Sequence, residues 1–311
     1  MKKILTIILS LISLAPFAQE NNYDISLGLH IPSQVENIPS SAKSMLSNKL
    51  GQVITANGIG ENSNYPRFII APNLNIISKD ILGTAPTRVA LNIELTLYIG
   101  DGISGDLFAS ESFSLKGVGL NENKAYIQAI KQLKTGNKSL QNFIANGKSK
   151  IIDYYNTNCD QIVSKAKVLE NQNNLEEALS LIANVPVSSD CFSKVEGKIK
   201  SLYQKAIDRD CKVKLLEAQS IWAANQDINA ANEAGALLAS IEPQASCFRD
   251  VKALFSKIES RVIDLQDRDW KYKLKVLDAV KDYVQAAKEI NLAYAKNQPK
   301  TVMYNVHGWY H

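Results

Sequence analysis

The chain has 311 residues, with 35 Lys and Arg against 31 Asp and Glu, so its formal net charge is +4. A balance this close to neutral gives no reason to expect binding to nucleic acid or to an anionic membrane. The length exceeds what one hydrophobic core usually organises, so we expect about two domains.

Residues 1–18 have the pattern of a secretory signal peptide. Lys2 and Lys3 precede an apolar run from Ile4 to Leu14, and small residues lead to a predicted cleavage point after Ala18. The run is too short to cross a hydrocarbon core of about 30 Å, so no transmembrane span is expected. No cysteine for lipid attachment lies near the cleavage point. We expect the processed chain in the periplasm or outside the cell.

Residues 19–150 are predicted to form an α+β domain. Alternation of apolar and polar residues predicts four strands, over 27–31, 67–77, 89–99 and 107–116. Helical spacing predicts a helix over 42–53, with a serine cap at its start and Gly58 and Gly60 at its end. A second helix would begin after Asn121 as its N-cap and cover the dry face of the sheet.

Gly117-Val118-Gly119 stands between the last predicted strand and this second helix. Free N–H groups beside a helix start can cradle an anion, and this is one interpretation of the motif. The third glycine and the strand–helix–strand unit of a dinucleotide fingerprint are missing, so we favour a turn in which glycine satisfies the backbone geometry. No cofactor is predicted.

The element order strand, helix, three strands, helix, with Gly117 and Gly119 ahead of a helix that contains Ala125 and Ala129, resembles a small envelope domain. That domain is found in the curli secretion channel subunit, in the lipoprotein activators of penicillin-binding proteins and in the N-terminal domain of the Tol translocation protein. The resemblance covers residues 23–135 and implies a domain that binds other envelope proteins and is not an enzyme. This chain lacks the lipidation cysteine of that group and an amphipathic insertion for a pore, so no channel role is expected.

Residues 151–268 are predicted to be an all-α domain that contains two copies of one unit. The Cys-Phe segments that begin at Cys191 and Cys247 align at an offset of 56 residues, together with the apolar positions around them. Upstream, Cys159 meets Cys211 at an offset of 52, and one extra helical turn in the second copy would explain the difference. Each copy then has a cysteine at the start of its first helix and another at the start of its third. For a secreted chain this predicts the disulfides Cys159–Cys191 and Cys211–Cys247.

The pattern Ala166-x-x-Leu169, followed by Leu175-Glu-Glu-Ala178 and Ile182, resembles the tetratricopeptide repeat, in which small alanines let two helices pack closely. We interpret each copy as a tetratricopeptide-like unit with a third helix. The resemblance implies a groove that receives partner proteins.

Residues 269–311 are predicted to hold a long helix and an aromatic tail. Asp269-Trp270 has the form of a helix cap and first turn. One apolar stripe follows, made of Trp270, Leu274, Leu277, Val280, Val284 and Ala287. The neighbouring lysines are interpreted as a solvated face rather than a binding patch: Lys271, Lys273, Lys275 and Lys281.

The tail ends in His307, Trp309, Tyr310 and His311. On a helix the two histidines would be spaced to hold a metal ion, but Gly308 argues against an ordered helix, so no metal site is predicted. Trp309 and Tyr310 either dock on the protein's own surface or, like Trp270, serve as anchors for a partner.

Neither a Ser-His-Asp nor a Cys-His arrangement can be built from local motifs around the three histidines. The cysteines lack the C-x-x-C spacing of zinc and redox sites. We therefore predict no catalytic residues and a non-catalytic interaction or assembly protein that binds other envelope or secreted proteins and no nucleic acid. Two alternatives stay open: a periplasmic enzyme or small-ligand or glycan-binding protein that uses the α+β domain, and a structural subunit of a surface or viral assembly.

Overall fold

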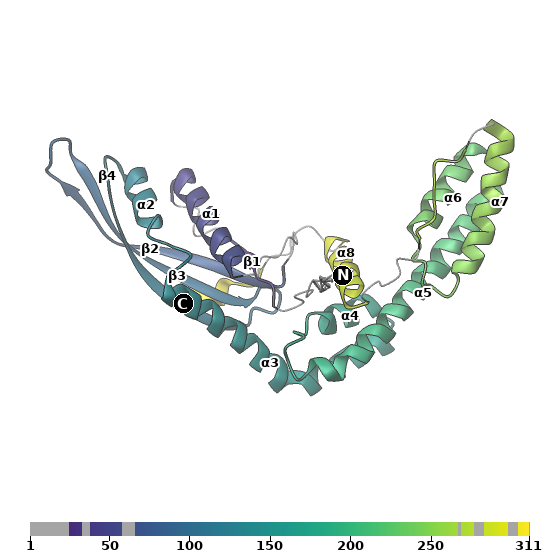
Figure 1. The fold of residues 1–311 in the computed structure, drawn as a ribbon, viewed down its shortest axis with the longest axis horizontal. Coiled ribbons are helices and arrows are strands. Elements are labelled where there is room, and N and C mark those ends of the chain that lie inside the picture. Colours follow the sequence, from purple (N-terminus) through teal and green to yellow (C-terminus); the bar gives the residue numbers. More distant parts are fainter. Residues whose placement is uncertain are drawn as a thin grey trace, which may run out of the picture.

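The computed structural model describes residues 25–32, 38–57, 66–266, 269–276, 283–297 and 304–310. It confirms the predicted fold class, because a four-stranded sheet with helices is followed by a largely helical half (Figure 1). Figure 1 shows two arms joined through α3 (Lys138–Asn171). Within the described ranges, no helix is long and apolar enough to cross a membrane. The predicted signal peptide lies outside these ranges.

The sheet has the strand order β1-β2-β3-β4. Its strands are β1 (Gly28–Leu29), β2 (Phe68–Leu82), β3 (Arg88–Asp101) and β4 (Leu107–Gly119). The short β1 runs parallel to β2 and pairs with it only at Ile69 and Ile70, whereas β2, β3 and β4 form an antiparallel meander. β2 is longer than predicted because Ile77 forms a bulge between Ile76 and Ser78, and this bulge breaks the alternation on which the prediction depends.

One face of the sheet is covered by α1 (Ser40–Ala56), α2 (Glu122–Ile130) and the first half of α3. Five β3 side chains on this face are buried: Leu91, Ile93, Leu95, Leu97 and Ile99. Four apolar side chains of α1 are fully buried as well: Ala42, Leu46, Leu50 and Val53. The predicted serine cap of α1 is wrong, because Pro39 takes the cap position without a side-chain hydrogen bond. The cap of α2 is as predicted, since the Asn121 side chain accepts from the Lys124 N–H at 3.0 Å.

Gly117-Val118-Gly119 lies inside β4 rather than in a turn. The only described glycine with positive φ is Gly105, so backbone conformation does not explain the motif. A Cβ atom at Gly117 would collide with the carbonyl oxygen of Ala125, and one at Gly119 would lie 2.5 Å from the Ala125 nitrogen. The predicted turn is therefore corrected: the glycines let the backbone of α2 approach the sheet closely.

The helical half contains two units that share one helix. It is built from the second half of α3 and from α4 (Leu175–Ala183), α5 (Phe192–Ala224), α6 (Ile228–Ser240) and α7 (Phe248–Gln266). α4 has 9 residues and α6 has 13, so the extra helical turn expected in the second copy is confirmed. The third helix of the first copy and the first helix of the second are one continuous α5, because no glycine or proline interrupts the chain around Cys211. Cys159 and Cys211 therefore lie inside α3 and α5, not at helix starts.

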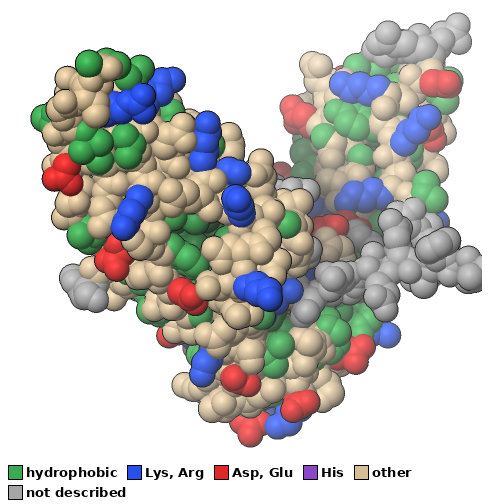
Figure 2. Space-filling view, turned by 60° about the vertical axis from the view of Figure 1, so that its left-hand side comes forward, with side chains coloured by type: hydrophobic (Ala, Val, Ile, Leu, Met, Phe, Trp, Pro, Cys, Tyr) green, Lys and Arg blue, Asp and Glu red, His purple; other side chains and the backbone are tan. Residues whose placement is uncertain are grey.

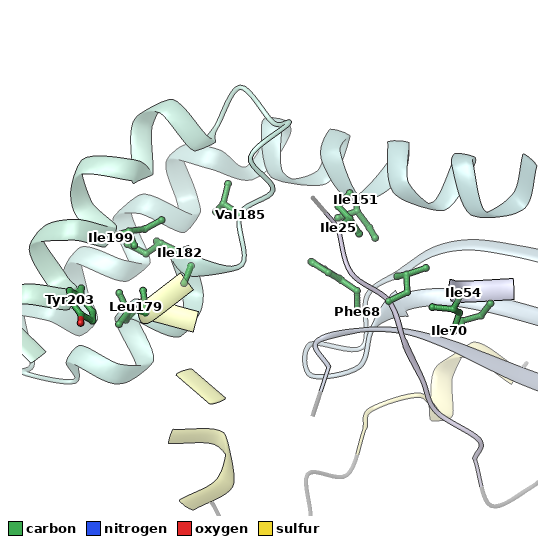
Figure 3. Close-up of a cluster of buried hydrophobic side chains, with 14 of the residues drawn as sticks. Ile25, Ile54, Phe68, Ile70, Ile151, Leu179, Ile182, Val185, Ile199 and Tyr203 are labelled. Carbon is green, nitrogen blue, oxygen red and sulfur yellow. The ribbon is translucent and has the colours of Figure 1, made fainter. Parts of the chain in front are cut away.

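α3 also runs without a break through residues 147–158, where the change of periodicity predicts the domain boundary. Figure 3 shows its two environments as two groups of buried side chains. Near the sheet, Ile151 of α3 lies by Ile25 and Phe68, whereas Leu179 and Ile199 belong to the packing of α4 against α5. One helix thus carries the chain from the sheet half into the repeat.

The predicted long helix from Asp269 is wrong, because residues 269–276 are not helical and α8 (Tyr283–Asn297) begins later. Trp270 and Tyr272 both pack against the second unit, with the Trp270 ring 4.8 Å from that of Phe255. A Cβ atom at Gly235 of α6 would collide with the Trp270 ring. A helix would point residues two apart in different directions, so an extended segment is needed to bury both rings. Leu277, Val280 and Lys281 lie outside the described residues.

Candidate interaction surfaces

The four cysteines pair as predicted. Cys159 and Cys191 are bridged with their Cα atoms 5.4 Å apart, and Cys211 and Cys247 with theirs 6.2 Å apart. The bridges join residues 32 and 36 positions apart, so in the chain-entropy treatment each contributes about 4 kcal/mol to stability. Disulfides persist in oxidising compartments, which is consistent with a protein of the envelope or the extracellular space.

Several surface cations of the helical half have carboxylate partners. Lys194 of α5 lies 3.0 Å from Asp160 of α3, and Lys205 pairs with Glu170 of the same helix. Arg209 donates to Glu176 of α4 and to the backbone carbonyl of Asn173, which lies just before that helix. Such exposed pairs stabilise a protein only slightly, but they leave a surface with mixed charge.

Exposed apolar side chains on the repeat helices add a feature that was not predicted from the sequence. Val213 and Leu216 of α5 are 59% and 63% exposed, and Val168 near the end of α3 is 54% exposed. Val213 and Leu216 are three residues apart and share one side of α5, away from the stripe that includes Cys211 and Leu215. The sequence holds one sign of this surface, because these apolar residues lie outside the buried stripe of their amphipathic helix.

The aromatic tail docks on the protein's own surface, which is the first of the two alternatives considered above. Trp309 lies in the short 3₁₀ helix η2 (His307–Tyr310), is 4% exposed, and donates its indole N–H to the Gly105 carbonyl at 2.7 Å. Gly100 leaves room for the ring, because a Cβ atom there would collide with it. Earlier in the tail, the Asn305 N–H donates to the Gly102 carbonyl at 2.8 Å. Residues 304–310 thus cover part of the sheet face opposite the helices.

These contacts change the expected anchor residues. Trp309 and Trp270 are both buried inside the chain's own packing, so neither side chain is available to a partner. Tyr310 is half-buried, with its ring 5.2 Å from that of Tyr98, and burial raises its pKa, with Tyr98 adding to the rise. Its hydroxyl has no hydrogen-bond partner in the described part of the chain. The His307 side chain and His311 lie outside the described residues.

Two clefts open on the sheet half. The first, about 610 Å³, lies between α1 and the segment that joins α2 to α3; we call it the lysine cleft. Its polar lining includes Lys49, Gln52, Gln132, Lys134 and Asn137. The second, about 440 Å³, follows the open edge of β2 over residues 73–76 and is bordered by Ile38, Tyr126 and Tyr310. These ammonium, amide and hydroxyl groups suit the binding of an anion or a polar ligand.

A buried polar cluster beside α3 fixes the 101–106 turn. Arg67 Nε lies 2.6 Å from Asp101 Oδ2, while Asp101 Oδ1 accepts from the N–H groups of Ile103 and Ser104. Tyr155 of α3 is buried nearby, and burial raises its pKa to about 12. Its hydroxyl has no hydrogen-bond partner among the described residues. The cluster fixes the turn that receives Trp309. Within the described ranges, no group of side chains is arranged to hold a metal ion.

Comparison with known proteins gives little guidance. No family model and no curated protein matches the chain. Among solved structures, a minor lipoprotein from Acinetobacter baumannii is 17% identical over 39% of this chain and 91% of its own, with a TM-score of 0.28. A chain named as a lipoprotein from Caulobacter crescentus is 11% identical over 40% of this chain and 83% of its own, with a TM-score of 0.24. TM-scores this low do not establish a shared fold.

Proposed function

We propose that this chain is a non-catalytic interaction or assembly protein of the cell envelope, exported to the periplasm or beyond, that binds another envelope or secreted protein. The observation that carries the proposal is the pair of disulfide-closed helical units that share α5. Stacked helical units form extended surfaces whose neighbouring parts are held at fixed spacing, and such surfaces commonly bind proteins.

The exposed apolar residues on the repeat indicate where contact is made. Val213 and Leu216 project from the helix that both units share. Exposed side chains of this kind become buried when a partner covers them, and burial of apolar area contributes to affinity. We therefore assign the contact to this side of α5, in place of the buried Trp309 and Trp270. The resemblance of the first half to envelope domains and of the repeat to tetratricopeptide units supports the same class of function.

The test is chemical cross-linking of the exported protein in intact envelopes, followed by mass spectrometry. The double variant Val213→Glu, Leu216→Glu is expected to lose the cross-linked partner, because it places two charges in the contact. The matched control is Ile263→Glu, Val276→Glu, which charges two residues that are 42% and 84% exposed outside α5. A partner that cross-links equally well to both variants would contradict the proposed contact, and a chain that never cross-links would contradict the function.

The lysine cleft favours a second candidate function, the binding of a small polar or glycan ligand by the sheet half. Two ammonium groups and three side-chain amides converge on one cleft of about 610 Å³. Native mass spectrometry of the exported protein tests this function, because a bound ligand adds its own mass. Lys49→Gln together with Lys134→Gln is expected to remove that added mass, and retention of the ligand would place it elsewhere.

A further inference from the structure

Charge is distributed unevenly among the segments of the chain. Residues 40–57 and 123–152, which form α1, most of α2 and the first part of α3, hold eight lysines and no Asp or Glu. Residues 153–266 instead mix 13 Lys and Arg with 16 Asp and Glu. The near-neutral total therefore conceals a helical layer in which Glu122, the first residue of α2, is the only acid.

We call five of these lysines the basic face: Lys49, Lys124, Lys131, Lys134 and Lys138. Lys49 and Lys134 meet at the lysine cleft, and the other three are exposed on α2, directly after its end and at the start of α3. None of the five forms an ion pair with a described carboxylate, in contrast to Lys194, Lys205 and Arg209 of the repeat. Figure 2 shows Lys and Arg side chains spread over the nearer, left-hand lobe, which is the sheet half. An uncompensated surface of one sign attracts a partner of the opposite sign.

The end of the sheet beside the basic face is apolar and exposed. All residues from 75 to 88 are exposed, so the β2–β3 hairpin projects beyond the helices that cover the sheet. Exposed apolar side chains gather there, in the order of the chain Ile76, Ile77, Ile81, Leu82, Val118 and Leu120. Lys79 of this hairpin pairs with Glu122 at the start of α2 at 2.5 Å, so the hairpin end adjoins the basic face.

The apolar residues occupy both faces of the hairpin end. Ile81 pairs with Val89 and lies on the face that the helices cover further along, whereas Leu82 and Val118 lie on the opposite face. A protein partner that docked on one face would leave the other exposed to water. If the whole hairpin end enters the interfacial region of a bilayer, both of its faces are removed from water.

From these observations we propose that the sheet half binds the surface of an anionic lipid bilayer. The hairpin end enters the interfacial region, and the basic face lies above the headgroups. Lysine suits this role because its ammonium group is a strongly hydrated point charge that interacts with phosphates without fixed geometry. The proposal goes beyond a protein partner for α5, and the two surfaces lie on different arms of the molecule (Figure 1).

Vesicle co-sedimentation of the exported protein tests the proposal. Binding is expected to vesicles of phosphatidylcholine with about 30% phosphatidylglycerol, weakly to phosphatidylcholine alone, and to fall between about 0.1 M and about 0.5 M NaCl. Lys124→Gln, Lys131→Gln, Lys134→Gln should lower the partition coefficient on the order of 100-fold, at about fivefold per lysine. The matched control Lys165→Gln, Lys167→Gln, Lys257→Gln removes three exposed lysines from the repeat and should leave binding unchanged.

A second pair of variants separates lipid from other polyanions. Ile81→Asn with Leu120→Asn should weaken vesicle binding at both salt concentrations, whereas Val276→Asn should not. If anionic vesicles bind no better than neutral ones, or if the repeat lysines matter as much as the basic face, the proposal is wrong. It is also wrong if the protein binds a dextran sulfate resin while anionic vesicles fail, because the basic face then serves a soluble polyanion. Loss of vesicle binding with an intact α5 cross-link would leave the proposed protein partner standing.

Discussion

Replacing Trp309 with alanine tests whether the C-terminal tail stabilises the sheet half. The side chain is 4% exposed and its indole N–H is bonded to the Gly105 carbonyl. Truncation of a buried tryptophan costs about 3–5 kcal/mol, and loss of the hydrogen bond adds about 1 kcal/mol. Because the tail can detach and regain chain entropy, we expect a loss near the lower end, about 3 kcal/mol.

Urea unfolding followed by far-ultraviolet circular dichroism measures this loss without depending on tryptophan fluorescence. Trp309→Phe is the control, since it keeps an aromatic ring and should lose about 1–2 kcal/mol. A Trp309→Ala variant that unfolds at the same urea concentration and with the same slope as the parent would refute the reasoning, because the tail would then contribute nothing to the sheet.

A double-mutant cycle with Gly100 locates the contact. A Cβ atom at Gly100 would collide with the Trp309 ring and lie 2.5 Å from the Asp106 carbonyl oxygen. Gly100→Ala should therefore destabilise the parent strongly. In the Trp309→Ala background the ring collision is absent, so the same change should cost less by at least about 1 kcal/mol. Additive effects would show that Trp309 does not occupy the space above Gly100.

Three further changes test other parts of the structure by the same urea assay. Cys211→Ser with Cys247→Ser should lower the free energy of unfolding by about 4 kcal/mol, and an equal stability of the reduced and oxidised parent would contradict this. Gly117→Ala should destabilise by about 2 kcal/mol or more because its Cβ meets the backbone of α2, whereas Gly197→Ala, with open space inside α5, should stabilise by about 0.5–1 kcal/mol. The pKa of Tyr155 is raised to about 12, so the folded state resists ionisation of its hydroxyl. The free energy of unfolding should therefore be full below about pH 10 and should fall as the pH rises toward 12. Tyr155→Phe should flatten part of that fall and, because it removes an unpaired hydroxyl, should not destabilise the protein at pH 7.

The elements that the sequence predicts correctly are those whose pattern is decided by one buried face. β3 alternates because its even and odd residues face different surroundings, and α1 repeats its apolar residues because one side packs on the sheet. The cysteine pairing followed from the duplication in a chain expected to be secreted, since equivalent positions in two copies must satisfy the same geometry. Local pattern is sufficient wherever the surroundings are uniform along an element.

The predictions that failed concern residues whose partners are distant in sequence. Trp270 looks like the first turn of a helix, but its position is set by Gly235 and Phe255, which no local pattern identifies. The sequence around Gly117 predicts a turn, but the role of this glycine depends on the close approach of Ala125. In both cases a glycine leaves room for a part of another element, and this is visible only when the elements are placed together.

The charge of the proposed membrane surface also depends on which segments of the chain lie together. The net charge of +4 over the whole chain indicated no charged partner, yet residues 40–57 and 123–152 hold eight lysines and no Asp or Glu, because the acids of the sheet half lie in its other segments. Charges counted separately for short segments, rather than for a whole domain, reveal this difference from the amino-acid sequence alone. The exposed hairpin end required the fold, because only the structure shows that the helices stop short of Ile81.

The four-residue difference between the two repeat units explains how their disulfides stay equivalent. Four added residues turn a helix by about 400°, so α6 gains one turn and its apolar stripe still faces α5 with a rotation of only about 40°. Two added residues would have turned that stripe to solvent and moved Cys247 away from Cys211. Because α5 belongs to both units, Val168 on α3 and Val213 and Leu216 on α5 are held by a framework that each disulfide closes. A partner that contacts both helices therefore meets a preformed surface and loses little entropy in ordering it.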